Sequence, residues 1–157
     1  MIRNHLVDLM INLEVAVYVQ NIIDGKEVAS SITVGVLSED TARDIEELTG
    51  LKVYGNRITM DIDAVRHIEN RHGIHGIQDH SMKDKNDIAK ISYILNNYGK
   101  MELSENLSKK YKTSKNMFSP HIILSKTIDD IYYVIEAVSD SKAKTNHIVS
   151  MYKQKKK

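Results

Sequence analysis

The densest group of chemically active side chains lies in the segment His67-Ile-Glu-Asn-Arg71-His72-Gly73-Ile-His75. His67 and Arg71 are four residues apart, so they share one face of a helix. His72 would lie at the C-terminus of that helix, where the helix dipole favours a protonated imidazole. A histidine that changes charge near neutral pH beside an arginine suits acid–base chemistry on a phosphodiester. The plain alternative is one histidine packed at the edge of the core and two exposed ones.

Metal binding is a second interpretation of the histidines. His67, His72, His75 and His80 could supply imidazole ligands to zinc. Their spacing matches neither the helical pair of the zinc proteases nor a structural site that contains cysteine. The chain has no cysteine, which also excludes disulfides and a thiol nucleophile. We therefore expect chemistry that uses no metal and no other cofactor.

A second group of polar side chains lies toward the end of the chain. Lys126 alternates with Ile122 and Leu124, so it lies on their side of a strand, and Ser150 and Tyr152 share a face of the last strand. A lysine can neutralise a phosphate and hydroxyls can position it. Strands often expose such residues to water, so this group alone is weak evidence.

The net charge of +1 conceals an asymmetry between the two halves of the chain. Residues 1–79 hold 7 Lys and Arg against 13 Asp and Glu, whereas residues 80–157 hold 15 against 8. A basic half indicates a surface for a polyanion, with Lys142, Lys144 and Lys153 as candidate contacts to it. The alternative for the terminal lysines is a solvated tail.

The length and composition limit the class of protein. A chain of 157 residues with 41% hydrophobic and 27% charged residues is typical of one globular domain, with or without an arm. It has no apolar stretch long enough to span a membrane, and its N-terminus lacks the parts of a classical signal peptide. The motifs of serine hydrolases, P-loop proteins, dinucleotide-binding proteins and zinc proteases are all missing.

Periodicity and capping residues predict helices first and strands last. Residues 6–17 fit a helical stripe, although Val15, Val17 and Val19 also alternate as in a strand, and Asp24-Gly25 could close a hairpin with residues 32–36. Further helices are expected from Ser38 to Leu48, from Ile62 to His72 and from Asp84 to Asn97. Strands are expected at 101–103, 122–127, 132–139 and 147–152. This order is that of an α+β domain.

The order of several short motifs resembles a known family. They are Val34-Gly35-Val36-Leu37-Ser38-Glu39, Leu48-Thr49-Gly50, Arg66-His67-Ile68-Glu69-Asn70-Arg71-His72-Gly73, Asp87-Ile88-Ala89-Lys90-Ile91-Ser92-Tyr93-Ile94-Leu95, Tyr132-Tyr133-Val134-Ile135-Glu136-Ala137-Val138 and Ile148-Val149-Ser150-Met151-Tyr152-Lys153. Together they resemble the phage-associated branch of the barnase–EndoU–colicin–RelE (BECR) nuclease superfamily over about residues 34–153. Each motif is short, and their order and spacing carry the resemblance.

The resemblance implies a fold, an activity and a context. It implies a metal-independent ribonuclease in which helices pack on a four-stranded antiparallel sheet, with residues 34–157 as the nuclease domain and residues 1–33 as an N-terminal helix or hairpin arm. Such domains occur in phage and prophage proteins and in bacterial toxins. The implied substrate is RNA, with tRNA as one candidate, and the implied protein partners are an immunity protein or a phage head protein. The implied location is the bacterial cytoplasm or the phage particle.

The resemblance also assigns roles to residues. The motif at the helix end corresponds to His67, Arg71 and His72, and the terminal-strand motif, commonly with Thr, corresponds to Ser150 and Tyr152. One His would accept the proton of the RNA 2′-OH and the other would protonate the leaving 5′ oxygen. Arg71 and Lys126 would stabilise the phosphorane. The rival hypothesis is a catalytically silent phage component that binds nucleic acid or a protein partner.

Overall fold

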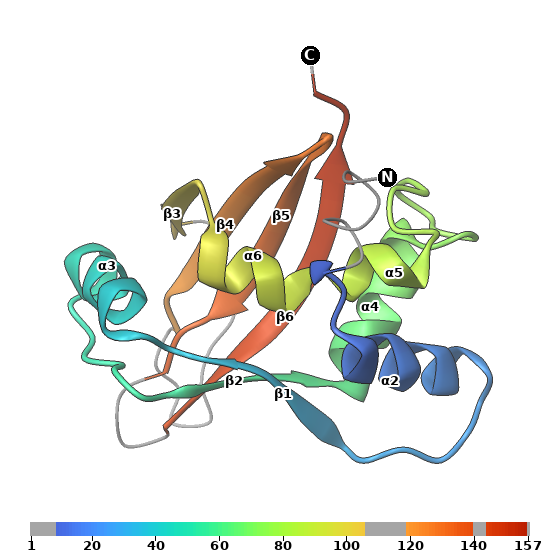
Figure 1. The fold of residues 1–157 in the computed structure, drawn as a ribbon, viewed down its shortest axis with the longest axis horizontal. Coiled ribbons are helices and arrows are strands. Elements are labelled where there is room, and N and C mark those ends of the chain that lie inside the picture. The colour runs from blue at the N-terminus through green and yellow to red at the C-terminus, as the bar shows by residue number, and fades with distance from the viewer. Residues whose placement is uncertain (1–8, 106–118, 140–143, 157) are drawn as a thin grey trace.

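The computed structural model describes residues 9–105, 119–139 and 144–156 (Figure 1). Its helices are α2 (Leu13–Ile23), α3 (Glu39–Thr49), α4 (Ile62–His72), α5 (Lys85–Ile88) and α6 (Ile91–Asn97). Its strands are β1 (Ser31–Val36), β2 (Arg57–Asp61), β3 (Lys100–Ser104), β4 (His121–Ile128), β5 (Asp130–Ala137) and β6 (Thr145–Gln154). The chain is therefore α+β, as its sequence predicts.

The six strands form one mixed sheet in the order β1-β2-β6-β5-β4-β3. Strands β3 to β6 pair with one another in antiparallel fashion and correspond to the four strands that were predicted. The prediction of a four-stranded antiparallel sheet is not exact, because β2 adds to β6 in parallel and β1 adds to β2. Strand β2 has only five residues between a turn and a helix, and its parallel partner lies far away in the sequence.

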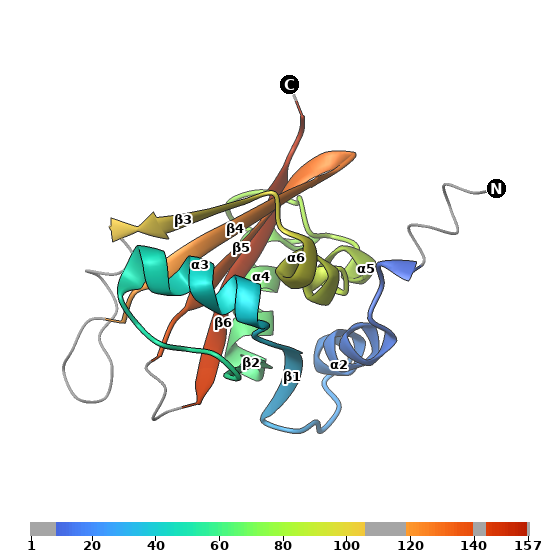
Figure 2. The ribbon, with the colours of Figure 1, turned by 60° about the vertical axis from the view of Figure 1, so that its left-hand side comes forward.

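The first described helix corrects the expectation of a hairpin. Leu13–Ile23 is helical, with Asn12 as its N-cap, and β1 pairs with β2 instead of folding back on these residues. Burial decides between the two patterns, because Val15 and Val19 are buried whereas Val17 is 59% exposed. Helix α2 packs beside α5 and α4, near the edge strand β1 (Figure 2).

Two helices begin and end where the capping residues predict. Ser38 caps α3 through its hydroxyl, and Gly50 ends this helix in the left-handed conformation that glycine adopts readily. The carboxylate of Asp61 accepts a hydrogen bond from the amide of Ala64 and so caps α4. These signals are local, which explains why the sequence alone predicts them.

The helix expected from Asp84 to Asn97 is interrupted after Ile88. The carbonyl of Ala89 accepts a hydrogen bond from the amide of Asn12 at 2.8 Å, so it is turned out of the helical ladder. Lys90 stands at the break and begins α6. A contact with residues far away in the sequence therefore divides one predicted helix into α5 and α6.

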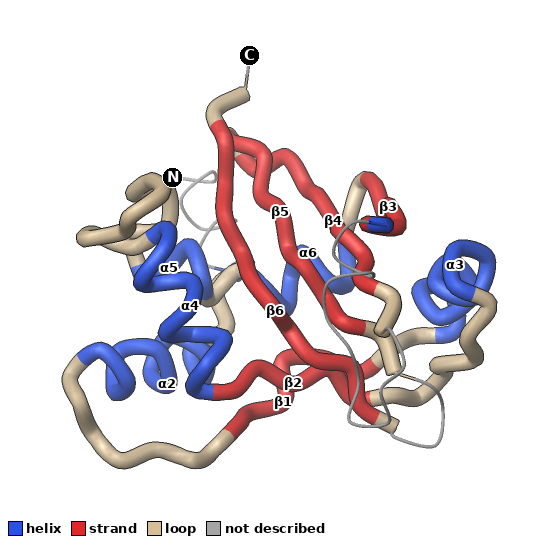
Figure 3. The backbone as a smooth tube through the Cα atoms, turned by 180° about the vertical axis from the view of Figure 1, so that it is seen from behind, coloured by secondary structure: helices blue, strands red, loops and turns tan. Residues whose placement is uncertain are grey.

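The register of the strands separates two faces of the sheet. The row Lys126–Tyr132–Lys153 and the row Leu124–Val134–Met151 point toward α5 and α6, and we call this side the core face. Because neighbouring residues of a strand point to opposite sides, Ser125, Tyr133 and Tyr152 lie on the other side, which we call the outer face. Within the described part of the chain, no helix crosses the outer face of β4, β5 and β6, and α4 lies alongside β6 (Figure 3).

Candidate active site

The C-terminus of α4 brings His72 to the edge of the outer face. Val65 and Ile68 are fully buried, and His72 continues their stripe one turn later. The side chain of His72 is consequently packed, with 4% of its surface exposed. Burial of an imidazole requires hydrogen-bond partners for its nitrogens.

Asp79 supplies one such partner from the loop that follows α4. Its Oδ1 lies 3.0 Å from Nδ1 of His72. Burial alone would raise the pKa of Asp79, but hydrogen bonds from Ser81 and from His72 outweigh this effect and hold the pKa below its ordinary value. An ionised carboxylate can only accept, so Nδ1 donates and Nε2 carries the lone pair of the neutral ring. No hydrogen bond in the described part of the chain uses Nε2 of His72.

The loop is folded tightly enough to fix Asp79. The carbonyl of Arg71 accepts hydrogen bonds from the amides of Gln78 and Asp79, and the carbonyl of His72 accepts one from Met82 at 2.8 Å. A Cβ atom on Gly76 would lie 2.3 Å from the carbonyl oxygen of Asp79. Only glycine fits this close approach of two backbone segments.

Two tyrosines extend the site across the sheet. The ring of His72 stacks on Tyr152 with centroids 5.3 Å apart, and Tyr152 stacks on Tyr133 at 5.0 Å. Burial raises the pKa of Tyr152, and the nearby Tyr133 and Asp79 raise it further. The Tyr152 hydroxyl therefore stays protonated at neutral pH and is available as a hydrogen-bond donor.

The structure brings some of the predicted residues to His72 and not others. Ser150 lies on the same face of β6 as Tyr152, since they pair with Ile135 and Tyr133, and it is buried. Arg71 precedes His72 and is exposed. His67 is half-buried, and its position five residues earlier rotates it about 140° around the helix axis from His72.

The predicted lysines lie elsewhere. Lys126 is on the side of Ile122 and Leu124, as expected, but this is the core face, opposite Ser150 and Tyr152. A register shift in β6 between Ile148 and Ser150 contributes to this, because it exchanges the faces of the residues that follow. The expected joint action of Lys126 with Ser150 and Tyr152 therefore finds no geometric support.

Three lysines were predicted to contact RNA. Lys142 lies outside the described residues. Lys144 is exposed before the start of β6, eight residues from Tyr152 and so about 26 Å away along the strand. Lys153 is on the core face and forms an ion pair with Asp87 at 2.9 Å. Neither Lys144 nor Lys153 therefore lies beside His72.

The core face carries a separate polar cluster that the sequence did not reveal. Asp87 accepts hydrogen bonds from Tyr132 at 2.6 Å, from Lys90 at 3.0 Å and from Lys153 at 2.9 Å. Burial would raise the pKa of Asp87, but these hydrogen bonds hold it below its ordinary value. Lys90 also donates to the hydroxyl of Tyr132 at 3.0 Å. We call these four residues the Asp87 cluster.

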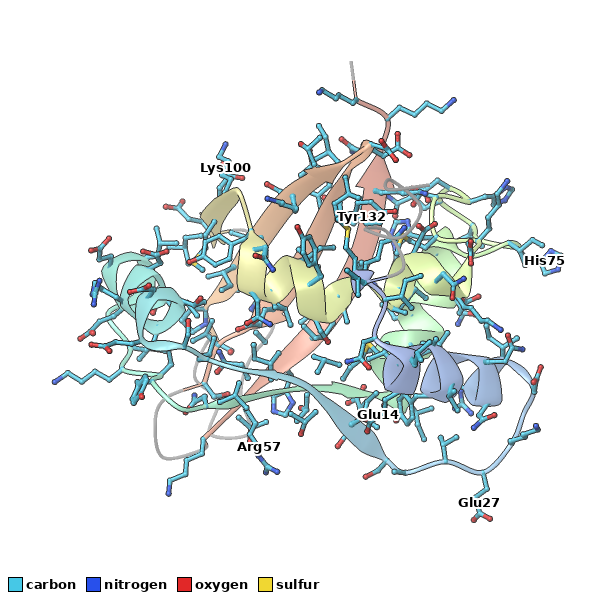
Figure 4. All side chains as sticks on the ribbon, viewed as in Figure 1. Glu14, Glu27, Arg57, His75, Lys100 and Tyr132 are labelled. Atoms are coloured by element: carbon cyan, nitrogen blue, oxygen red, sulfur yellow. The ribbon has the colours of Figure 1, made fainter. Side chains whose placement is uncertain are left out.

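The histidines predicted as alternative zinc ligands do not converge. Across residues 9–105, 119–139 and 144–156, no three His, Asp or Glu side chains are grouped as metal ligands. His75 and His80 are exposed, and the side chain of His75 extends into solvent (Figure 4). The zinc hypothesis therefore has no ligand set in the described residues.

Two members of the site escaped the sequence analysis. Asp79 could have been found as the first carboxylate after His72, in a loop that contains two glycines. Tyr133 could have been found only from the strand register, since a tyrosine in a strand has no distinctive sequence signal. The sequence was sufficient to locate the end of α4. Which side chains contact His72 at that end depends on the pairing of distant strands.

Comparison with known proteins is consistent with this geometry. The family model for phage-Barnase-EndoU-ColicinE5/D-RelE like nuclease 3 matches residues 35–157. The chain belongs to this family of phage-associated nucleases, as the order of its motifs predicts. No curated protein and no solved structure gives a significant match. None of the described helices has the length and apolar character needed to cross a membrane.

Proposed function

We propose that the chain is a metal-independent endoribonuclease that cleaves RNA by attack of the 2′-OH on the adjacent phosphate. Membership of a nuclease family supports a nucleic acid substrate. The observation that carries the proposal is the pair formed by His72 and Asp79, with Nε2 of His72 unengaged beside Tyr152. A carboxylate that fixes the imidazole tautomer is the usual way to prepare a general base.

The proposed reaction assigns one role to each of these groups. Nε2 of His72 takes the proton of the 2′-OH as the bond from O2′ to phosphorus forms. The bond from phosphorus to O5′ then breaks, and O5′ takes a proton from water. The hydroxyl of Tyr152 donates a hydrogen bond to a phosphate oxygen, and the exposed Arg71 balances the phosphorane charge. The products are a 2′,3′-cyclic phosphate and a 5′-hydroxyl.

His67 has a weaker claim to the role of acid. Its rotation around α4 separates it from the face that carries His72, so the two imidazoles do not flank one phosphate. Ser150 is two residues from Tyr152 on the same face of β6, but its side chain is buried. It can orient the phosphate only if the substrate extends along β6 past the ring of Tyr152. We therefore assign the chemistry to His72, Asp79 and Tyr152 and leave Ser150 in a supporting position.

The test combines product analysis with a matched pair of variants. The purified chain is incubated with total RNA and with a tRNA pool, with and without EDTA, and the ends are analysed. We expect cleavage that persists in EDTA and leaves 2′,3′-cyclic phosphates. His72→Gln retains most of the bulk of the buried ring and should lower the cleavage rate about 100-fold or more.

The control is His75→Gln, which changes an exposed histidine three residues further on and should cleave like the original chain. Melting temperatures of both variants separate loss of chemistry from loss of folding. Cleavage that disappears on chelation would reject the metal-independent mechanism. Full activity of His72→Gln would show that His72 is a packed residue and that the general base lies elsewhere. Absence of cleavage by the original chain would favour the catalytically silent alternative.

A further inference from the structure

A row of side chains runs across the outer face, starting at the proposed active site. Tyr152 in β6 is paired with Tyr133 in β5, Tyr133 with Ser125 in β4, and Ser125 with Lys100 in β3. Side chains that are directly opposite each other on neighbouring strands are in contact range on one face. With increasing distance from His72, the row therefore consists of two aromatic side chains, one small side chain and one cationic side chain.

The aromatic part of the row ends at Tyr133. Helix α4 lies on one side of β6 and β5 on the other (Figure 3), so Tyr152 is held between the rings of His72 and Tyr133. The next side chain beyond Tyr133 is Ser125, which is too small to cover an aromatic ring. One side of the Tyr133 ring thus has no aromatic neighbour among these paired positions.

We propose that Tyr133 and Ser125 form a subsite for one nucleobase of single-stranded RNA, which continues the stack, while Lys100 binds a neighbouring phosphate. The proposal rests on the proposed function, since it assumes a polynucleotide that reaches His72. Aromatic side chains bind unpaired bases in this way, and every base has a face that can stack. The subsite consequently favours unpaired RNA and has little preference for base identity.

The dimensions of a sheet fit this arrangement. Stacked rings have centroids about 4.5–7 Å apart, and neighbouring strands are separated by about 4.8 Å. A base stacked on Tyr133 would therefore lie above Ser125. The next strand, β3, carries Lys100 at the far side of that position.

Lys100 is suited to a phosphate contact. Its side chain, labelled in Figure 4, is 67% exposed, and its amine forms an ion pair with Glu102 at 2.8 Å. The hydrogen bond to Glu102 and the negative charge of that carboxylate raise the pKa of Lys100, so the amine is protonated and positively charged at neutral pH. An exposed ion pair of this kind contributes little to stability and can be exchanged for a phosphate.

The absence of tryptophan from the sequence allows a direct binding experiment. Tyr133→Trp introduces a single indole, whose fluorescence is followed during titration with a short 2′-O-methyl oligouridine. This RNA has no free 2′-OH, so it binds without being cleaved. We expect saturable quenching for Tyr133→Trp. The matched control is Tyr54→Trp, which changes an exposed tyrosine between α3 and β2 and should show none.

A second measurement separates stacking from general packing. Affinities are measured for the original chain, Tyr133→Phe and Tyr133→Leu, each with the intact oligomers and with oligomers that lack one base, the abasic position being moved along the chain. For intact RNA, Tyr133→Leu should weaken binding roughly 10-fold or more and Tyr133→Phe should not. When the missing base is the one that stacks on Tyr133, the original chain and Tyr133→Leu should bind the oligomer with the same affinity.

The outcomes discriminate between the subsite and the reaction. Equal affinity of all three chains for intact RNA, or a Tyr133→Trp signal that RNA does not change, would overturn the subsite. RNA that is bound with these effects but never cleaved would leave the subsite standing and reject the proposed function. Lys100→Gln should also reduce the slope of log affinity against log salt by about 0.7, whereas Lys52→Gln should not. An unchanged slope would remove Lys100 from the subsite.

Discussion

Tyr132 and Tyr133 are consecutive residues of β5, but their surroundings differ. On the core face, Tyr132 joins the Asp87 cluster, in which every charged group has a hydrogen-bonded partner of opposite charge. On the outer face, Tyr133 continues a stack of rings that ends in His72, whose Nε2 is unengaged within the described part of the chain. The Asp87 cluster has satisfied its charged groups, whereas the stack of rings on the outer face ends in a nitrogen that has no partner among the described residues.

The difference indicates what each face is for. A buried polar group is costly unless it is paired, so a fully paired cluster stabilises the fold and resists any ligand that would break its bonds. A nitrogen without a partner is available to a substrate. The Asp87 cluster also connects α5 and α6 to β5 and β6, so its effect should be measured in folding and not in catalysis.

The largest expected effect is on the core face. Asp87→Ala leaves the buried amine of Lys90 without its carboxylate, and removal of one partner of a buried ion pair typically costs about 3–5 kcal/mol. Urea denaturation should show this loss of stability. The matched control is Asp130→Ala, because Asp130 lies 3.8 Å from Lys153 and is more exposed, and it should cost at most about 1 kcal/mol. Equal effects of the two substitutions would show that the buried cluster contributes no more than an exposed ion pair and would contradict the stabilising role assigned to it.

A second buried carboxylate sharpens the comparison, because it has no cation. Glu136 accepts a hydrogen bond from Asn146 at 2.8 Å, and its Oε1 has no partner among the described residues. Its neighbours across the strands are Ile122 and Ile148. Burial raises the pKa of Glu136 to about 7, and the bond from Asn146 opposes this only in part.

The two carboxylates should give opposite pH dependences. Between about pH 4.5 and 7 the folded chain keeps the Glu136 proton that the unfolded chain releases, so stability falls as pH rises, by on the order of 3 kcal/mol. Asp87, with a lowered pKa, stabilises the fold above the pKa of its unfolded form and loses this effect as pH falls. Glu136→Gln should flatten the decline between pH 5 and 8 in urea denaturation. An unchanged decline would show that Glu136 ionises normally.

Removing one hydroxyl from each face gives a direct test of the comparison. Tyr132→Phe deprives Asp87 and Lys90 of a buried hydrogen bond and should cost about 1–3 kcal/mol of stability with unchanged cleavage. Tyr152→Phe keeps the stacked ring, so stability should change by less than about 0.5 kcal/mol while cleavage falls about tenfold or more. Denaturation and cleavage of both variants are measured on the same preparations. If Tyr132→Phe lowered cleavage and Tyr152→Phe lowered stability, the roles of the two faces would have to be exchanged.

The sequence predicts well what neighbouring residues determine. The caps Ser38, Gly50 and Asp61 lie next to the helices they bound, so α3 and α4 were placed correctly. The faces of Lys126 and of Ser150 with Tyr152 were also right within each strand. Their relation across the sheet depends on register and on the shift within β6, neither of which a local pattern encodes.

Contacts between distant segments account for the remaining errors. The alternating valines of α2 fit a strand as well as a helix, and only packing against α4 and α5 selects the helix. The site has the same limit, since His72 was predicted from its place at a helix end but two other members of the site were not. Asp79 comes from a loop with its own hydrogen bonds, and Tyr133 comes from a strand about sixty residues later.

The smallest expected effect concerns Asp79, which acts through His72 and does not touch the substrate. Asp79→Asn keeps the size of the side chain and can still accept the Nδ1 hydrogen bond, but it removes the charge that stabilises the imidazolium. We expect kcat to fall about tenfold with KM nearly unchanged, because binding of RNA does not depend on this carboxylate. Asp63→Asn, an exposed aspartate in the first turn of α4, serves as the control for charge. Since the Asp79 side chain is 40% exposed, its loss should change stability little. A fall in stability with normal kcat would instead make Asp79 a fold-stabilising partner of His72, and the outer face would then resemble the core face.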